Sequence, residues 1–206
     1  MAFDRLVITI TAAAWLVGGA SHAVGDAFQP QIPAPIVADV DAARAKLQQG
    51  TLDEAISILD KAVAAQPNFF RAHYNLGLAK LRKGDVDDGI RSLTQALQLR
   101  EKEGLKDATI YNSLGYAYMV KRDWANGEKY LRAAAQHETE NTQTSNQKVY
   151  NNLGLLYLYT GRFDDARKVF VVARDRFGST QAAASLALVD QLEAGSRAQA
   201  AGEKKP

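Results

Sequence analysis

Apolar positions along most of the chain recur at intervals of three, four and seven residues, which is the spacing of one face of an α-helix. Segments with this spacing come in pairs, and a short polar turn divides each pair, at 49–52, 83–86, 121–124 and 160–163. Glycine stands in three of these turns, where its left-handed conformation ends a helix without a steric penalty. The pattern therefore predicts an all-α fold built from antiparallel helix pairs.

The helix pairs are copies of one unit. Small residues 34, 38 and 39 positions apart mark equivalent points in the first helices, at Ala43, Gly77, Gly115 and Gly154. Large apolar residues stand between small ones in the second helices, at Leu59, Leu93, Leu131 and Phe170. One pair cannot bury both of its faces, so the units are expected to stack. We expect units at 37–68, 70–103, 108–139 and 147–177, followed by a capping helix at 179–194.

These residues resemble the tetratricopeptide repeat family, whose pattern joins a Leu-Gly motif on the first helix to small and aromatic residues on the second. The resemblance covers roughly 37–177 and is specific in the fourth unit, at Tyr150, Leu153, Gly154, Tyr157, Gly161, Phe163, Ala166, Phe170 and Ala173. It implies a right-handed superhelical array of about four antiparallel helix pairs plus a C-terminal capping helix. The third unit departs from the pattern, because Arg122 replaces the turn glycine at a cost of about 1 kcal/mol if it is left-handed.

The N-terminal segment 1–23 has the order of an export signal. A basic residue at position 5 precedes the uncharged run 6–20, and small residues at positions 21 and 23 suit a signal peptidase. An uncleaved anchor over 6–24 is the alternative, although a spanning helix needs about 20 residues; a buried apolar helix is the third interpretation. We expect an exported bacterial protein, located in the periplasm or anchored to the inner membrane by 6–24.

The two flanks of the array have their own composition. Residues 24–36 hold Pro30, Pro33 and Pro35, which predicts an extended linker, since proline lacks the N–H that helices and central strands require. Residues 195–206 are polar and end in Lys-Lys-Pro, so we expect a disordered tail there.

Composition removes several functional classes. The chain has 25 basic and 23 acidic side chains and a net charge of +2, so no nucleic-acid partner is expected. It lacks cysteine, and its histidines at 22, 73 and 137 form no metal-ligand motif. Acidic pairs at 87–88 and 164–165 fall at helix starts, where carboxylates favour the helix dipole. We therefore expect no enzyme activity, no cofactor and no metal.

The resemblance implies that one stripe of each first helix lines an inner surface that binds a partner. In this chain the stripe consists of Arg71, Tyr74, Asn75, Leu78, Arg82, Asn112, Ser113, Tyr116, Lys148, Asn151, Asn152, Leu155 and Tyr159. Asparagine amides can both donate to and accept from a peptide backbone, and we expect them to face outward. The cations of the stripe favour an extended, somewhat acidic segment.

The predicted function is a non-catalytic interaction scaffold of the cell envelope that holds a segment of another envelope protein. Membrane contact is expected only through the N-terminal segment, if that segment is not cleaved. The main alternative is a permanent structural subunit of a membrane-associated complex that makes contact through its convex face and loops. A third hypothesis, dimerisation through an end helix, is disfavoured by the polar residues Gln181 and Glu193 on the last helix.

Overall fold

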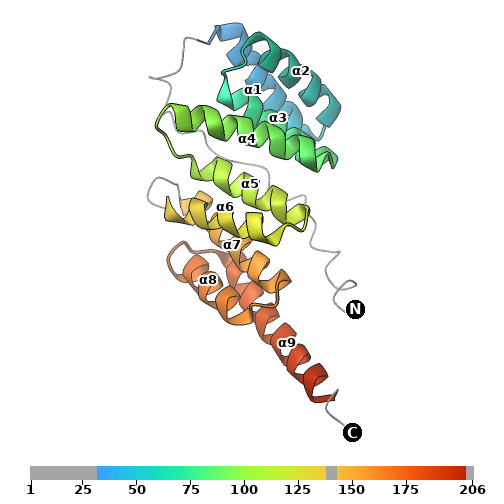
Figure 1. The fold of residues 1–206 in the computed structure, drawn as a ribbon, viewed down its shortest axis with the longest axis vertical. Helices are drawn as coiled ribbons and strands as arrows, with labels where there is room; N and C mark the ends of the chain where they lie inside the picture. The colour runs from blue at the N-terminus through green and yellow to red at the C-terminus, as the bar shows by residue number, and fades with distance from the viewer. Residues whose placement is uncertain (1–31, 138–142, 203–206) are drawn as a thin grey trace.

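The fold is all-helical, as predicted. The computed structural model describes residues 32–137 and 143–202, and this part of the chain contains helices and no strand (Figure 1). The helices are α1 Ala34–Gln49, α2 Leu52–Ala65, α3 Phe70–Lys83, α4 Val86–Lys102, α5 Ala108–Val120, α6 Trp124–Gln136, α7 Gln143–Tyr159, α8 Phe163–Asp175 and α9 Thr180–Gly202.

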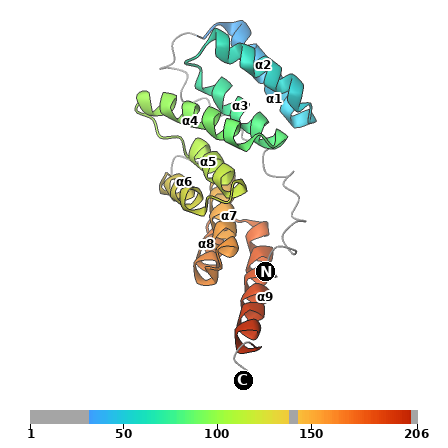
Figure 2. The same cartoon turned by 45° about the vertical axis from the view of Figure 1, so that its right-hand side comes forward.

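Consecutive helices pack in pairs, and the pairs stack into an elongated superhelical array (Figures 1 and 2). Each odd-numbered helix also contacts the next odd-numbered helix, whereas the even-numbered helices contact mainly their odd-numbered neighbours. The odd-numbered helices therefore form the more closely packed, inner layer, and the even-numbered helices form the outer layer. Helix α9 packs on α8 and then projects from the C-terminal end of the array in both views.

Small residues let the two helices of a pair approach closely. A Cβ atom added at Gly77 would lie 2.7 Å from Cγ of Leu93, and one added at Gly154 would lie 2.5 Å from Cε1 of Phe170. Leu93 and Phe170 are themselves fully buried. In both pairs, the glycine therefore makes room for the large residue that the second helix of the same pair places opposite it.

Left-handed residues end the first helices of the pairs. Gly50, Gly84 and Gly161 have φ angles of 82°, 98° and 73° after α1, α3 and α7. Arg122 takes the same role after α5 with a φ of 61°, and it is the non-glycine residue with positive φ in the described part of the chain. The third turn therefore keeps the geometry of the other turns, although the Cβ of Arg122 disfavours the left-handed conformation.

Both ends of the array are more helical than the sequence indicated. The predicted linker 24–36 overlaps α1, which begins at Ala34, because Pro33 caps the helix and Pro35 lies in its first turn, where no N–H donor is needed. The predicted tail 195–206 overlaps α9, which continues to Gly202 through alanine-rich sequence that favours helix. The export segment 1–23 and the remainder of the linker lie outside the described residues. Within the described residues, none of the helices has both the length and the apolar character that a membrane span requires.

Candidate functional site

The inner-layer cations of the N-terminal half are bound by the chain itself. Arg71 on α3 forms an ion pair with Asp41 on α1, with 3.0 Å between Nη2 and Oδ1. Arg82, at the other end of α3, donates from Nη1 to the backbone carbonyl of Leu47. These two side chains join α3 to α1. The positive charges that the stripe predicts for the second unit therefore already have partners within the fold.

The apolar members of the second unit are also used in packing. The hydroxyl oxygen of Tyr74 lies 3.4 Å from Oγ of Ser113 on α5, and burial raises the pKa of Tyr74 to about 12. Leu78 is buried in the apolar cluster shared by α3, α4 and α5. Ser113 is buried as well and donates to the carbonyl of Thr109. The stripe on α3 thus forms part of the contact between the second and third units.

The predicted outward orientation of the asparagines is wrong for Asn75, Asn151 and Asn152, all of which are buried. Asn75 donates to the carbonyl of Arg71 at 2.8 Å, and Asn151 donates to Oγ of Ser179 at 2.9 Å. Asn152 on α7 donates to Oδ1 of Asn112 on α5 at 3.0 Å. The reason is that odd-numbered helices contact one another, so these amides are covered by the neighbouring helices. Asn151 and Asn152 bond to residues of the next or preceding unit, whereas Asn75 satisfies its amide within α3.

An exposed apolar patch remains at the C-terminal ends of α5 and α7. Val120 is 48% exposed and Tyr159 is 43% exposed, and they are the exposed large hydrophobic residues of the described chain. The indole of Trp124 stacks on Tyr159 with 5.7 Å between ring centroids. Burial raises the pKa of the partly buried Tyr116 on α5, and its electrostatic interaction with Tyr159 on α7 raises this pKa further. We call Tyr116, Val120, Trp124 and Tyr159 the inner aromatic patch.

Sequence reasoning did not single out Trp124 as a candidate site residue. It starts α6, outside the first-helix stripe on which the candidate residues were sought. The signal that could have pointed to it was a large aromatic residue directly after a polar turn.

Lys148 lies toward the opposite end of α7 from Tyr159. It is partly buried, and burial lowers the pKa of its ammonium group. No carboxylate of the described residues forms an ion pair with it. Leu155, between Lys148 and Tyr159 on the same helix, packs against the apolar cluster of α7 and α8. Lys148 therefore differs from Arg71 and Arg82, whose donors are used inside the chain.

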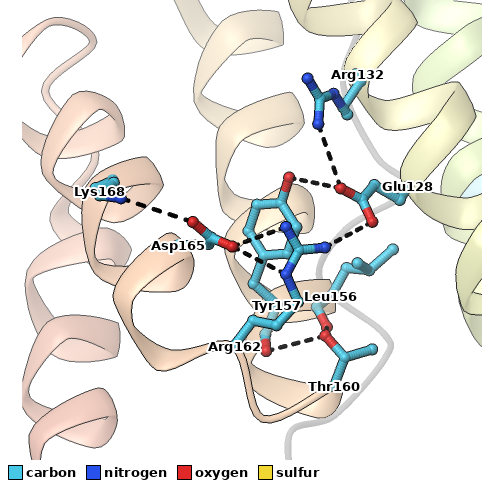
Figure 3. A network of polar contacts seen from close by, with 8 residues as sticks. All are labelled: Glu128, Arg132, Leu156, Tyr157, Thr160, Arg162, Asp165 and Lys168. Carbon is cyan, nitrogen blue, oxygen red and sulfur yellow. Dashed lines mark hydrogen bonds and ion pairs between the residues drawn. The ribbon is translucent and has the colours of Figure 1, made fainter.

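A polar network on the outer side joins the third and fourth units (Figure 3). The carboxylate of Glu128 on α6 accepts from the Tyr157 hydroxyl at 3.0 Å and from Nη1 of Arg162 at 2.8 Å. Arg162 also lies 4.2 Å above the Tyr157 ring and pairs with Asp165 at 2.7 Å. The network holds α6, α7 and the start of α8 together.

A cleft of about 360 Å³ opens beside this network and is lined by residues of α6, α7 and α8. Its rim carries Arg132 and Lys168, which face the nearby carboxylates of Glu128 and Asp165 at 3.5 and 3.8 Å. Within residues 32–137 and 143–202, no three histidine or acidic side chains gather as a metal site would require. The arrangement offers surfaces for contact with a macromolecule.

Solved structures resemble the array over most of its length. A crystal structure of MamA has 24% identity and a TM-score of 0.62, and the match covers 76% of this chain and 81% of that chain. PilF of Pseudomonas aeruginosa has 20% identity and a TM-score of 0.68, with coverage of 78% and 69%. TTC0263 of Thermus thermophilus, a thermophilic tetratricopeptide repeat protein, has 20% identity and a TM-score of 0.64, with coverage of 76% and 82%. At these identities the likeness establishes a shared fold.

Sequence comparison finds no match among curated proteins. Family models described as tetratricopeptide repeat match residues 40–90, 74–141 and 148–176, which together make up more than half of the chain. The matches cover the four helix pairs, including the departure at Arg122. The chain belongs to the tetratricopeptide repeat family.

Proposed function

We propose that this protein is a non-catalytic scaffold that holds a segment of a partner protein against the inner layer of its array, between α5 and α7. Tetratricopeptide repeat proteins generally mediate protein–protein interaction. The observation that carries the proposal is the inner aromatic patch, in which Val120 and Tyr159 are exposed although the other large apolar side chains of the described residues are buried or partly buried. Exposed aromatic residues that gather in one place are typical of surfaces that bind a partner.

The proposal includes a location outside the cytoplasm, in the periplasm of a bacterium, with another envelope protein as partner. Its support is the order of charged, apolar and small residues in 1–23. The intact mass of the protein recovered from its native membrane fraction tests it. A chain that starts at Val24 supports cleavage and release, and a chain that keeps 1–23 supports an anchor over 6–24.

The permanent-subunit hypothesis is the second candidate, and the outer cleft beside Glu128 favours it. A contact there would use the outer helices and leave the inner aromatic patch free. Size exclusion of a native extract separates the two functions. A permanent subunit elutes entirely in a large complex, whereas a scaffold with reversible contacts also elutes at the size of the free chain.

The decisive experiment compares two surfaces of the same full-length chain. The double variant Val120→Ser/Tyr159→Ser removes the exposed apolar side chains and should not disturb buried packing. Arg91→Ala, whose side chain is 70% exposed on α4, serves as the outer-surface control. The expected result is that an envelope partner captured by the wild type is lost with the double variant and kept with Arg91→Ala. Capture that survives the double variant removes the inner-surface proposal. Asn75 and Asn152 are unsuitable for this test, because their amides are buried in the fold.

A further inference from the structure

Within the described residues, Lys148 and the inner aromatic patch give the inner surface a cationic contact and an apolar contact for a ligand. We propose that the segment bound there is an extended peptide with an acidic side chain and a large apolar side chain four to six residues apart. The acid pairs with Lys148 and the apolar side chain covers the inner aromatic patch. This inference rests on the proposed function and specifies the chemistry of its partner.

Charge identifies Lys148 as the point that receives the acid. Among the inner-layer cations of the predicted stripe, Arg71 pairs with Asp41 and Arg82 donates to a backbone carbonyl. Lys148 has no such carboxylate within the described residues and is partly buried, which disfavours its charged form. A partly buried cation is costly unless a counter-charge is supplied, and a carboxylate of the partner would supply it. The same contact would be weakened by added salt.

The inner aromatic patch offers the second point of contact. Val120 and Tyr159 come from the ends of α5 and α7, and Trp124 supports Tyr159 by stacking on it. The exposed ring of Tyr159 is held by Trp124, so it can contact a partner at little cost in side-chain entropy. A large aliphatic or aromatic side chain of the partner would bury this exposed area. The patch therefore selects the apolar side chain of the ligand.

The helix between the two points sets their spacing. Lys148 and Tyr159 are eleven residues apart on α7, which corresponds to about 16 Å along the helix axis at about 1.5 Å per residue. An extended peptide advances about 3.3 Å per residue, so about five residues bridge this length. Side-chain reach at both ends broadens the spacing to between four and six residues.

Asn112 provides a contact between the two ends. Its Oδ1 accepts from Asn152, and its side chain is partly exposed on α5. In the described part of the chain, no acceptor is bonded to its Nδ2 group. That donor can bind a backbone carbonyl of the peptide as the peptide passes from Lys148 to the patch. A segment that crosses this polar point needs its backbone exposed, which favours an extended ligand over a helical one.

The outer cleft does not compete for this ligand. Its rim cations, Arg132 and Lys168, already face the carboxylates of Glu128 and Asp165. An acidic peptide there would have to displace those contacts. The cleft is lined by residues of α6, α7 and α8, and no residue of α5 lines it.

Selection from random twelve-residue peptides displayed on phage tests the proposal. The full-length chain is immobilised through a C-terminal tag, and parallel selections use Lys148→Glu, Val120→Ser/Tyr159→Ser and the outer control Lys168→Glu, whose side chain is 77% exposed. Wild type and Lys168→Glu are expected to enrich Asp or Glu four to six residues from a large apolar residue. Lys148→Glu is expected to enrich Lys or Arg at the acidic position. The patch variant is expected to lose the apolar requirement.

A reciprocal charge exchange completes the test. A fluorescent peptide from the wild-type selection should bind Lys148→Glu at least tenfold more weakly, and replacing its acid by lysine should restore most of that loss. Lys148→Gln serves as the second variant if Lys148→Glu has altered helical circular dichroism. Peptides enriched without the acid–apolar spacing, or an unchanged preference in Lys148→Glu, overturn the ligand and leave the scaffold function standing. If wild type and patch variant enrich the same peptides, both the ligand and the inner-surface function are wrong.

Discussion

The two halves of the inner layer carry the same stripe of helix positions and use it differently. On α3, Arg71 and Arg82 reach back to α1, and Tyr74 and Leu78 pack into the contact with the third unit. On α5 and α7, the corresponding region leaves Val120 and Tyr159 exposed and Lys148 without a carboxylate from the described residues. Both halves use polar groups to join units, as Asn152 does with Asn112, but the second half also retains groups that a partner can use.

This difference shows that position in a repeat does not by itself define a binding residue. Whether a stripe residue is available to a partner depends on the adjacent helix. Helix α1 presents Asp41 and the Leu47 carbonyl to α3, and these acceptors bind Arg71 and Arg82. No comparable acceptor of the described residues reaches Lys148 on α7. Substitutions at glycine, asparagine, arginine and lysine positions test this difference between the halves.

Gly154→Leu should have the largest effect, because its Cβ would lie 2.5 Å from the Phe170 ring. We expect a loss of about 3 kcal/mol in the free energy of unfolding, together with loss of partner binding. Gly77→Leu is the matched change in the first half, with 2.7 Å from the new Cβ to Cγ of Leu93. It should cost a similar amount and spare partner binding below the melting temperature, because units contact mainly their neighbours.

Denaturant unfolding followed by circular dichroism measures both losses, and capture of the selected peptide measures binding. An unchanged midpoint for Gly154→Leu would mean that α7 and α8 do not touch at this glycine. Gly195→Ala is a suitable control, because it replaces a helical glycine whose added Cβ would meet no atom within 4 Å beyond the adjoining residues and backbone of its own helix. It should stabilise the chain by up to about 1 kcal/mol.

Asn151→Ala should lower the free energy of unfolding by about 1–3 kcal/mol, because it removes the partner of buried Ser179. Ser179 also accepts from the backbone N–H of Ala182, so the start of α9 should loosen with it. Tyr159→Ser, on the same helix but exposed, should change stability by less than about 0.5 kcal/mol. Chemical denaturation of the two variants side by side measures the difference. Equal losses of stability would contradict the assignment of Asn151 to the fold and of Tyr159 to the partner-binding surface.

Arg122→Gly should stabilise the chain by about 1 kcal/mol, since glycine adopts a φ of 61° without the Cβ penalty. The reciprocal change in the first half, Gly84→Arg, should destabilise it by a similar amount at a φ of 98°. Thermal unfolding of the pair measures the two shifts. A loss of stability in Arg122→Gly would show that contacts of the arginine side chain outweigh its backbone strain.

Lys148→Met should raise stability by at most about 0.5 kcal/mol at neutral pH, because it removes a partly buried charge. The pKa of Lys148 is lowered by burial, so the unfolded state binds its proton more tightly than the folded state. The cost of burial is present while the folded lysine is charged, and it fades as pH rises through the folded pKa toward the ordinary value of 10.5. Denaturation midpoints at pH 7 and pH 10 should therefore differ less between variant and wild type at the higher pH.

Much of the fold could be predicted, because the contacts that create it are local and periodic. The glycine at 154 and the phenylalanine at 170 belong to one unit, and their spacing alone indicates two helices that meet. The repeat identifies Arg122 as the turn residue of the third unit, and the structure shows that this residue is left-handed. The ends were harder, because a proline such as Pro33 or Pro35 disrupts the middle of a helix but suits its first turn, and composition does not distinguish these cases.

The candidate site was predicted less well, because exposure depends on contacts between units. Helical spacing places Asn75 and Asn152 on the inner stripe, but it does not show that the facing helices come close enough to bury them. It also does not show that Asp41, thirty residues earlier, would neutralise Arg71. Tyr116, Lys148 and Tyr159 remain proposed partner-binding residues. Trp124 is added to them because its ring stacks on Tyr159.

The carboxylate of Glu128 has a consequence for how such a chain can diverge. It accepts hydrogen bonds from the Tyr157 hydroxyl and from Nη1 of Arg162, and these two contacts join the third and fourth units (Figure 3). Arg132, 3.5 Å from the same carboxylate, lies on the same helix as Glu128. A single replacement at 128 would leave Tyr157 and Arg162 without their shared acceptor. In homologous sequences, the residues at positions 128, 157 and 162 are therefore expected to change together, while the exposed residue at position 168 varies independently. Such covariation would show that the contact between these two units is conserved or lost as a whole.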